Sequence, residues 1–205
     1  MTELSREIGE FADGIIQSYR AAVELNLIFA KGQLAYKMKA TVPKLNQEGR
    51  IAIKSARHPL IDPAVVVPVD IALGGAYETM VITGPNTGGK TVTLKTAGLL
   101  CAMAQHGYLI PAHESSSVCV FGEILVDIGD EQSIEQSLST FSGHIKNITG
   151  ILKLAGPQTL VLMDELGAGT DPAEGAALAV SVIEALRGLG AKIMATTHYS
   201  ELKIF

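Results

Sequence analysis

The stretch that decides the fold follows the apolar run 80–82 and is Gly84-Pro85-Asn86-Thr87-Gly88-Gly89-Lys90-Thr91. Its spacing fits the pattern G-x-x-x-x-G-K-[ST], with a short β-type segment before it and a helix-forming stretch, 91–105, after it. The glycines let successive backbone N–H groups face an anion, and the helix start adds the positive end of its dipole. The pattern therefore predicts a phosphate-binding loop built from all eight residues.

Two side chains of this loop carry specific chemistry. Lys90 is placed to reach the outer phosphates of a nucleotide, and the Thr91 hydroxyl is placed to ligate Mg²⁺. A tight glycine turn with an exposed lysine would show the same residues. The strand-loop-helix context favours the nucleotide site.

An acid pair follows a later apolar strand. Residues 160–163 are Leu-Val-Leu-Met, and Asp164 and Glu165 come next, which is the Walker B pattern. Asp164 is expected to help hold Mg²⁺, directly or through water, because ligands collect at the carboxyl ends of strands in open α/β sheets. Glu165 is expected to orient or deprotonate the attacking water. The pair alone is a weak signal, since acids often end strands, but together with the loop it indicates a hydrolytic site.

Three more polar residues are candidates for the same site. His198 lies just past the apolar strand 192–196, where it could polarise and sense a γ-phosphate or serve a structural role. Ser139 opens a helix, so it caps that helix or binds an anion there. Gln132 lies in the polar loop 127–133 and is expected near Mg²⁺ and the lytic water.

Other polar residues are interpreted structurally. Asp171 is expected to cap the helix that starts at Pro172, although its glycine-rich loop could also meet a partner subunit. The only cysteines, Cys101 and Cys119, are expected to be reduced core thiols. The remaining histidines are interpreted as ordinary surface or core residues: His58, His106, His113 and His144.

The order of segments predicts an α/β fold. Apolar strands alternate with helices in the second half of the chain, which predicts a mostly parallel central sheet buried on both faces. Short β-type runs (51–56, 65–71, 119–121) separated by Pro and Gly predict an additional antiparallel part. We expect a helical segment over residues 1–43 and the nucleotide-binding domain over residues 44–205.

The N-terminal segment carries an apolar stripe at spacings of three and four residues. The stripe extends toward Tyr36 with an interruption at Gly32, and an unbroken helix of that length would be roughly 50 Å long. Such a helix either projects from the domain or packs along an edge, and the alternative is an ordinary surface helix that packs on the core. The stripe consists of Leu4, Ile8, Phe11, Ile15, Tyr19, Ala22 and Val23.

Charge limits the partners of this chain. It has 205 residues, 16 of them basic and 21 acidic, for a net charge of −5. A domain that grips DNA through its phosphates normally has a basic excess, so nucleic acid is expected to be contacted mainly by regions outside this chain. No run of membrane-spanning length and no signal peptide is evident, which predicts a cytoplasmic protein.

Taken together, the motifs resemble the ATPase domain of the MutS family, within the ABC class of P-loop ATPases. Within that family the chain is most similar to the second bacterial paralogue, a branch associated with suppression of recombination and with stalled ribosomes. The resemblance covers nearly the whole chain. It is carried by residues 57–60 (Arg-His-Pro-Leu), 83–91, 128–134, 138–141 (Leu-Ser-Thr-Phe), 164–170 and 197–199.

The resemblance implies an ATPase that converts ATP and water to ADP and phosphate with Mg²⁺. Two such domains would form a homodimer with ATP sandwiched between them, and Ser139 of one subunit would touch the γ-phosphate held by the other. Glu165 would activate water, His198 would sense the γ-phosphate, and turnover would drive a DNA clamp. A full-length member carries clamp and lever regions before the domain and a small nuclease-like domain after it, so the chain resembles a C-terminally truncated piece.

Two alternatives remain open. Another ABC ATPase, such as a transporter or chromosome-structure motor, would carry an L-S-G-G-Q-type signature, whereas residues 138–141 stand in its place here. A nucleotide-binding or assembly module would bind ATP or ADP without appreciable hydrolysis. The group that stacks on adenine is not assigned, because the aromatic contact of the family has no clear match among residues 65–67.

Overall fold

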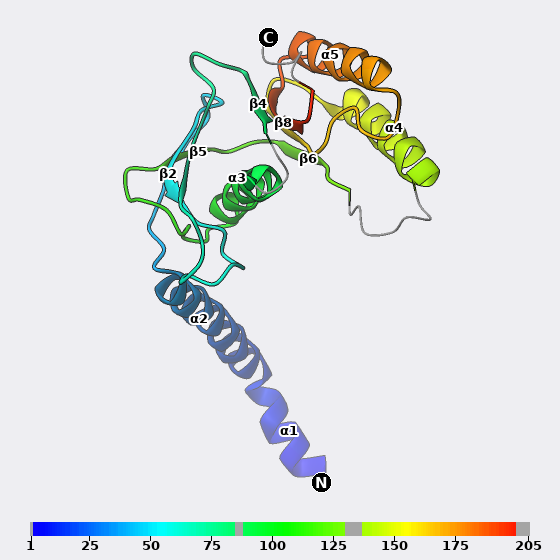
Figure 1. Cartoon of the computed structure of the whole chain (residues 1–205). Helices are drawn as coiled ribbons and strands as arrows, with labels where there is room; N and C mark the ends of the chain where they lie inside the picture. Colours follow the sequence, from blue (N-terminus) through cyan, green and yellow to red (C-terminus); the bar gives the residue numbers. More distant parts are fainter. Residues whose placement is uncertain (1, 85–87, 130–136, 200–205) are drawn as a thin grey trace.

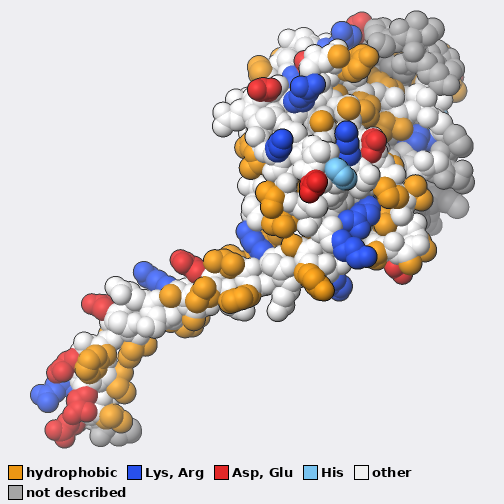
Figure 2. Space-filling view, turned by 90° about the vertical axis from the view of Figure 1, so that its left-hand side faces the viewer, with side chains coloured by type: hydrophobic (Ala, Val, Ile, Leu, Met, Phe, Trp, Pro, Cys, Tyr) orange, Lys and Arg blue, Asp and Glu red, His pale blue; other side chains and the backbone are white. Residues whose placement is uncertain are grey.

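A computed structural model describes residues 2–84, 88–129 and 137–199. It begins with two helices, α1 (Thr2–Glu10) and α2 (Ala12–Met38), which project from the body of the molecule (Figure 1). Every residue of α1 is exposed, and Ala35 is the one buried residue of α2, a helix described throughout. The helical path is broken at Phe11 and continues through Gly32, so the expected interruption at Gly32 is wrong. The apolar stripe does not pack on the core, and Figure 2 shows hydrophobic side chains along the projecting arm.

Two cationic side chains attach this arm to the body. The Arg57 guanidinium donates to the last carbonyls of α2, those of Met38 at 3.1 Å and Lys39 at 2.9 Å. The Lys31 ammonium lies 4.5 Å from the centre of the Tyr108 ring, a cation–π contact. The base of α2 is therefore held at two places.

The first sheet is the mixed part of the fold. Its order is β1 (Lys44–Asn46), β5 (Ser117–Cys119), β2 (Ile51–Ala56) and β3 (Val69–Leu73). Strand β2 is antiparallel to both β3 and β5, and β1 is parallel to β5, which confirms the expected antiparallel part.

Two strand boundaries differ from the expectation. The run expected as strand over residues 65–71 begins only at Val69, because the amides of Val65 and Val66 both donate to the carbonyl of Asp62 in a turn. The strand expected over 119–121 ends at Cys119, and the Phe121 amide instead donates to the side chain of Gln105. In both places local hydrogen bonds replace the sheet ladder.

The second sheet is parallel throughout. Its order is β4 (Thr79–Thr83), β8 (Lys192–Thr197), β7 (Thr159–Met163) and β6 (Glu123–Asp127). Helix α3 (Lys90–Gln105) lies between the two sheets, whereas α4 (Ser137–Leu154) and α5 (Pro172–Gly188) cover the opposite face (Figure 1). All five residues of β7 are buried. The carboxyl ends of the four strands meet at one edge, where the candidate site lies.

Two hydrophobic clusters hold these layers together. One joins α3 to both sheets through residues such as Ile53, Leu100 and Leu160, and the other joins α4 and α5 to the far face through Ile148, Ile183 and other buried residues.

Cys101 and Cys119 are free and buried, as expected. Burial, with the neighbouring Cys119 thiol, raises the pKa of Cys101 to about 12, so it remains a thiol. Within the described part of the chain, no helix is long and apolar enough to cross a membrane.

Candidate nucleotide-binding site

The loop after β4 leads into an open helix start. Gly84 follows β4 with φ 144°, and Gly89 precedes α3 with φ 74° in the left-handed region that glycine adopts readily. Because Gly89 has no side chain to cap α3, the first N–H groups of this helix receive no side-chain cap, the arrangement that suits an anion. Lys90, only 5% exposed, donates from its ammonium to the Gly84 carbonyl oxygen. Residues 85–87 of the predicted loop lie outside the described residues.

The predicted metal ligands lie together. Thr91 Oγ1 donates to Oδ1 of Asp164 at 3.1 Å, and Asp164 is 5% exposed. Hydroxyl and carboxylate oxygens are the hard ligands that Mg²⁺ prefers, so the two residues fit the ion. Within the described ranges no three His, Cys, Asp or Glu side chains form a metal cluster.

Thr196, to which the sequence analysis gave no role, links the two acids. Its buried hydroxyl donates to Asp164 Oδ1 and accepts the amide hydrogen of Glu165 at 2.8 Å. One hydroxyl thus fixes the carboxylate of the first acid and the backbone of the second. The available signal was a pair of hydroxyl side chains, Thr196 and Thr197, directly after the apolar residues 193–195 of β8.

Glu165 is turned toward His198. Its φ of 51° is uncommon for a residue with a side chain, and the next amide, that of Leu166, donates to the Thr196 carbonyl at 2.9 Å. Glu165 Oε1 lies 3.6 Å from His198 Nε2, and the two side chains are 19% and 44% exposed. The structure therefore brings together the acid and the histidine that the sequence singled out separately.

Two other candidates cannot be compared with these residues, because their side chains lie outside what the structure describes. Ser139 lies in the first turn of α4, and its side chain is outside what the structure describes. Gln132 also lies outside the described residues. Their proposed contacts rest on the sequence alone.

A cavity of about 350 Å³ opens beside the helix start. The Gly88–Gly89 backbone and Val92 of α3 line one side, and His58 and the valines at 65–67 line the other. Burial, with a smaller contribution from the Lys95 charge, lowers the pKa of His58, which favours a neutral imidazole. The sequence analysis treated His58 as ordinary, although it lies within the motif at residues 57–60.

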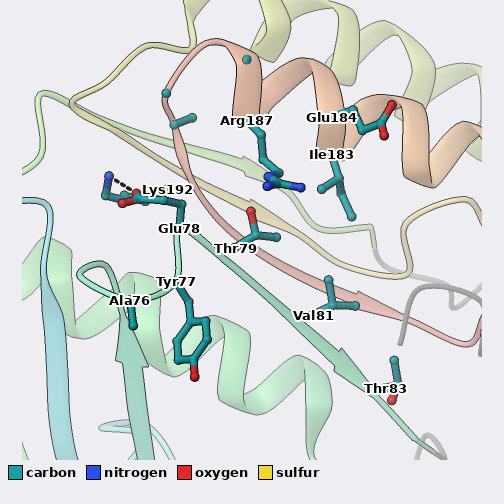
Figure 3. A pocket seen from close by; sticks show the side chains of 13 residues that line it. Ala76, Tyr77, Glu78, Thr79, Val81, Thr83, Ile183, Glu184, Arg187 and Lys192 are labelled. Carbon is teal, nitrogen blue, oxygen red and sulfur yellow. Dashed lines mark ion pairs between the residues drawn. The ribbon is translucent and has the colours of Figure 1, made fainter. Parts of the chain in front are cut away.

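A larger cavity than this one lies elsewhere among the described residues. It has a volume of about 1000 Å³ and is lined by edge strand β4 and by α5, with Tyr77, Thr79 and Arg187 among its side chains (Figure 3). Lys192 and Glu78 form an ion pair at its rim. None of its lining residues belongs to the predicted nucleotide site, so size alone is a poor guide to the chemistry here.

The loop after the acid pair is packed tightly onto α5. Asp171 Oδ1 accepts the Ala173 amide at 2.9 Å, which confirms the predicted helix cap. The Tyr199 hydroxyl donates to the Gly167 carbonyl at 2.9 Å. A Cβ on Gly175 would overlap both that carbonyl oxygen and the Tyr199 hydroxyl. The loop therefore has little room to move against α5.

These features define a class: an α/β domain with a parallel sheet, consistent with the P-loop ATPase fold. Residues 80–205 match the sequence profile of MutS domain V, and the chain therefore belongs to the MutS family.

The curated relatives are bacterial proteins named Endonuclease MutS2. The chain is 57% identical over 201 residues to that of Caldanaerobacter subterraneus subsp. tengcongensis, an alignment covering 98% of this chain and 25% of the relative. It is 58% identical over 205 residues to that of Lactobacillus helveticus, covering 100% of this chain and 26% of the relative. The chain thus spans about a quarter of the length of these relatives, and the similarity supports the MutS2 branch of the family.

Proposed function

We propose that this chain binds ATP with Mg²⁺ and hydrolyses it to ADP and phosphate, as the ATPase domain of a MutS-like DNA-associated protein. The observation that carries the proposal is the contact of Thr91, at the start of α3, with Asp164, which follows β7. This contact supports the proposal because a hydroxyl and a carboxylate from residues far apart in sequence lie close enough that both would enter one Mg²⁺ coordination shell.

The phosphates would bind at the start of α3. Gly84, Pro85, Asn86, Thr87, Gly88 and Gly89 form the loop, and the Lys90 ammonium exchanges its Gly84 carbonyl contact for phosphate oxygens. Thr91 and Asp164 would hold Mg²⁺, which neutralises charge on the transferring phosphoryl group when bound.

Glu165 is the proposed general base. Its backbone is held through Thr196, and its carboxylate faces His198, the proposed sensor of the γ-phosphate. A well-placed base increases the rate about 10²–10⁴-fold. The uncommon backbone conformation at residue 165 is consistent with such a role, because strained conformations are often found at active sites.

The nucleotide base would enter the cavity lined by His58 and the valines at 65–67. That cavity is lined by Gly88 and Gly89, directly before the start of α3, and by Val92 in the first turn of that helix. Apolar walls with a few polar groups are typical of ligand pockets. A neutral imidazole can donate or accept one hydrogen bond to the base edge.

The remaining parts of the proposal come from the family resemblance. Residues 44–205 would form an ABC-type ATPase domain and residues 1–43 the end of a helical lever. Two domains would pair as a homodimer, with Ser139 and Gln132 contributing to a composite site. The hydrolysis cycle would drive a DNA clamp, in a cytoplasmic protein that suppresses recombination, with DNA or ribosome contacted mainly by other regions. The net charge of −5 supports that last point.

Equilibrium binding of a fluorescent ATP analogue to Lys90→Ala tests the proposal. We expect affinity to fall at least tenfold, because a buried ammonium would no longer meet the phosphates. Lys95→Ala is the matched control, since it removes an exposed cation from the same helix, and it should bind within twofold of the wild type. Equal binding by all three proteins would refute the proposed phosphate site. Tight binding with no phosphate release by the wild type would favour the assembly module.

A further inference from the structure

A second buried acid lies directly beside the proposed catalytic pair. Asp127, the last residue of β6, has a side chain only 6% exposed. Its backbone carbonyl accepts the amide hydrogen of Asp164 at 2.8 Å. The position of Asp127 therefore bears directly on the position of the Asp164 backbone.

Two side chains of helix α4 form hydrogen bonds with the Asp127 carboxylate. His144 Nδ1 lies 2.9 Å from Asp127 Oδ2, and Asn147 Nδ2 donates to Asp127 Oδ1 at 2.9 Å. The Asn147 amide also reaches the Val126 carbonyl, at 3.0 Å. His144 and Asn147 are three residues apart, so they share one face of the helix. Because a carboxylate only accepts hydrogen bonds, Nδ1 of His144 carries the hydrogen.

The His144 ring is confined on its other side. A Cβ on Gly129 would lie 2.9 Å from His144 Nε2, so the backbone after β6 runs directly against the imidazole. A small cavity of about 10 Å³, close to the space of one water molecule, is lined by Asp127, His144, Glu165 and Phe141, among others. His144 and the proposed base thus border the same cavity.

We infer that His144 is a positioning residue for the ATPase reaction, acting through Asp127 on the backbone of Asp164. This inference rests on the proposed function. The hydrogen bond from Nδ1 satisfies a buried carboxylate that would otherwise turn toward another donor and move the end of β6. The same bond ties α4, whose first turn carries Ser139, to the strand end beside the acid pair. His144 needs no contact with nucleotide for this role.

Two substitutions of similar size separate the hydrogen bond from simple packing. In His144→Asn the amide nitrogen takes the place of Nδ1, so the donor to Asp127 is kept. In His144→Gln the amide nitrogen takes the place of Nε2, so the donor is moved away from Asp127. Thr149→Ala is the control on the same helix, because the exposed Thr149 hydroxyl bonds only locally, to the Ile145 carbonyl at 2.7 Å.

The experiment uses the full-length protein that carries this chain and measures kcat, the Kd for ATP in EDTA and hydrogen exchange at the Asp164 amide. We expect His144→Gln to lower kcat about tenfold with this metal-free Kd within twofold, since small misplacements of catalytic groups cost up to about 10² in rate. The Asp164 amide should exchange faster in this variant. His144→Asn should restore kcat and exchange to near wild-type values, and Thr149→Ala should match the wild type.

Wild-type kcat in His144→Gln, or equally low kcat in both His144 variants, would overturn the inference. A change in the Kd for ATP in EDTA matching the change in kcat would also overturn it, because Asp164 acts through the metal ion and the reaction and not through metal-free nucleotide binding. Failure of the proposed function is distinguishable. In that case the wild type itself would show no ATP turnover, while exchange at the Asp164 amide would still report whether His144 holds this strand end.

Discussion

The hydroxyl of Thr91 donates a hydrogen bond to Oδ1 of Asp164 across 3.1 Å, although the two residues are 73 positions apart in sequence. This contact joins the first turn of α3 to the residue that follows the buried strand β7. It is the point at which the predicted phosphate-binding loop meets the acid pair.

Replacing this hydroxyl should weaken the metal-dependent part of nucleotide binding. Thr91→Val keeps the side-chain shape but removes one oxygen ligand, so we expect MgATP affinity to fall about tenfold, or ~1.4 kcal/mol. ATP affinity in EDTA should change less than twofold. Calorimetric titration with and without Mg²⁺ measures both values. A loss of equal size in EDTA would show that Thr91 contributes through packing or phosphate contact and not through the ion.

Thr196 should support both stability and turnover. Thr196→Val leaves the buried Glu165 amide without its acceptor, which costs about 1–3 kcal/mol, and it removes one of the two hydroxyl donors to Asp164 Oδ1. We expect a clear fall in melting temperature and in kcat. Thr196→Ser keeps the hydroxyl and should recover most of both, whereas a serine variant as impaired as the valine variant would contradict the role given to the hydroxyl.

The loop after the acid pair should be sensitive to one methyl group. Gly175→Ala places a Cβ against the Gly167 carbonyl and the Tyr199 hydroxyl, so we expect a loss of about 1–3 kcal/mol. That corresponds to a melting temperature lower by roughly 2–10 °C for a chain of this size. Gly188→Ala, in the same helix with open space around it, should be neutral or slightly stabilising. Equal melting temperatures for the two variants would contradict the packing described here.

His58 should make stability depend on pH in a defined direction. Burial, assisted by Lys95, lowers its folded-state pKa below the usual 6.5, so the unfolded chain binds its proton first as the pH falls. The contribution of neutral His58 to the free energy of unfolding is therefore fully present above about pH 6.5. It is lost as the pH falls through and below that value. Melting temperatures between pH 5 and pH 7.5 should fall less on acidification in His58→Gln than in the wild type. Identical profiles would contradict this assignment.

Part of the fold followed from sequence periodicity because the inner strands of the parallel sheet are buried. The apolar run 160–163 lies in β7, which is buried throughout and has a continuous hydrophobic sequence, whereas the run 80–82 lies in edge strand β4, which is only half-buried. Periodicity did not show that α2 projects from the body. An apolar stripe identifies the apolar face of a helix but does not identify the surface that packs against this face.

The site was only partly visible in the sequence. Lys90, Thr91 and Asp164 were singled out by motif spacing, and the structure brings them together. Thr196 and His144 were missed, because their roles depend on contacts across strands and between α4 and β6 that no local pattern encodes.

The central claim is that Glu165 acts as the base in ATP hydrolysis at this site. The most direct measurement is phosphate release from saturating MgATP by the wild type and by Glu165→Gln, with nucleotide affinity determined for both. We predict that kcat falls about 10²–10⁴-fold while affinity stays within a few-fold, because the amide keeps the size of the carboxylate but cannot accept a proton. Undiminished phosphate release by the glutamine variant would contradict the account.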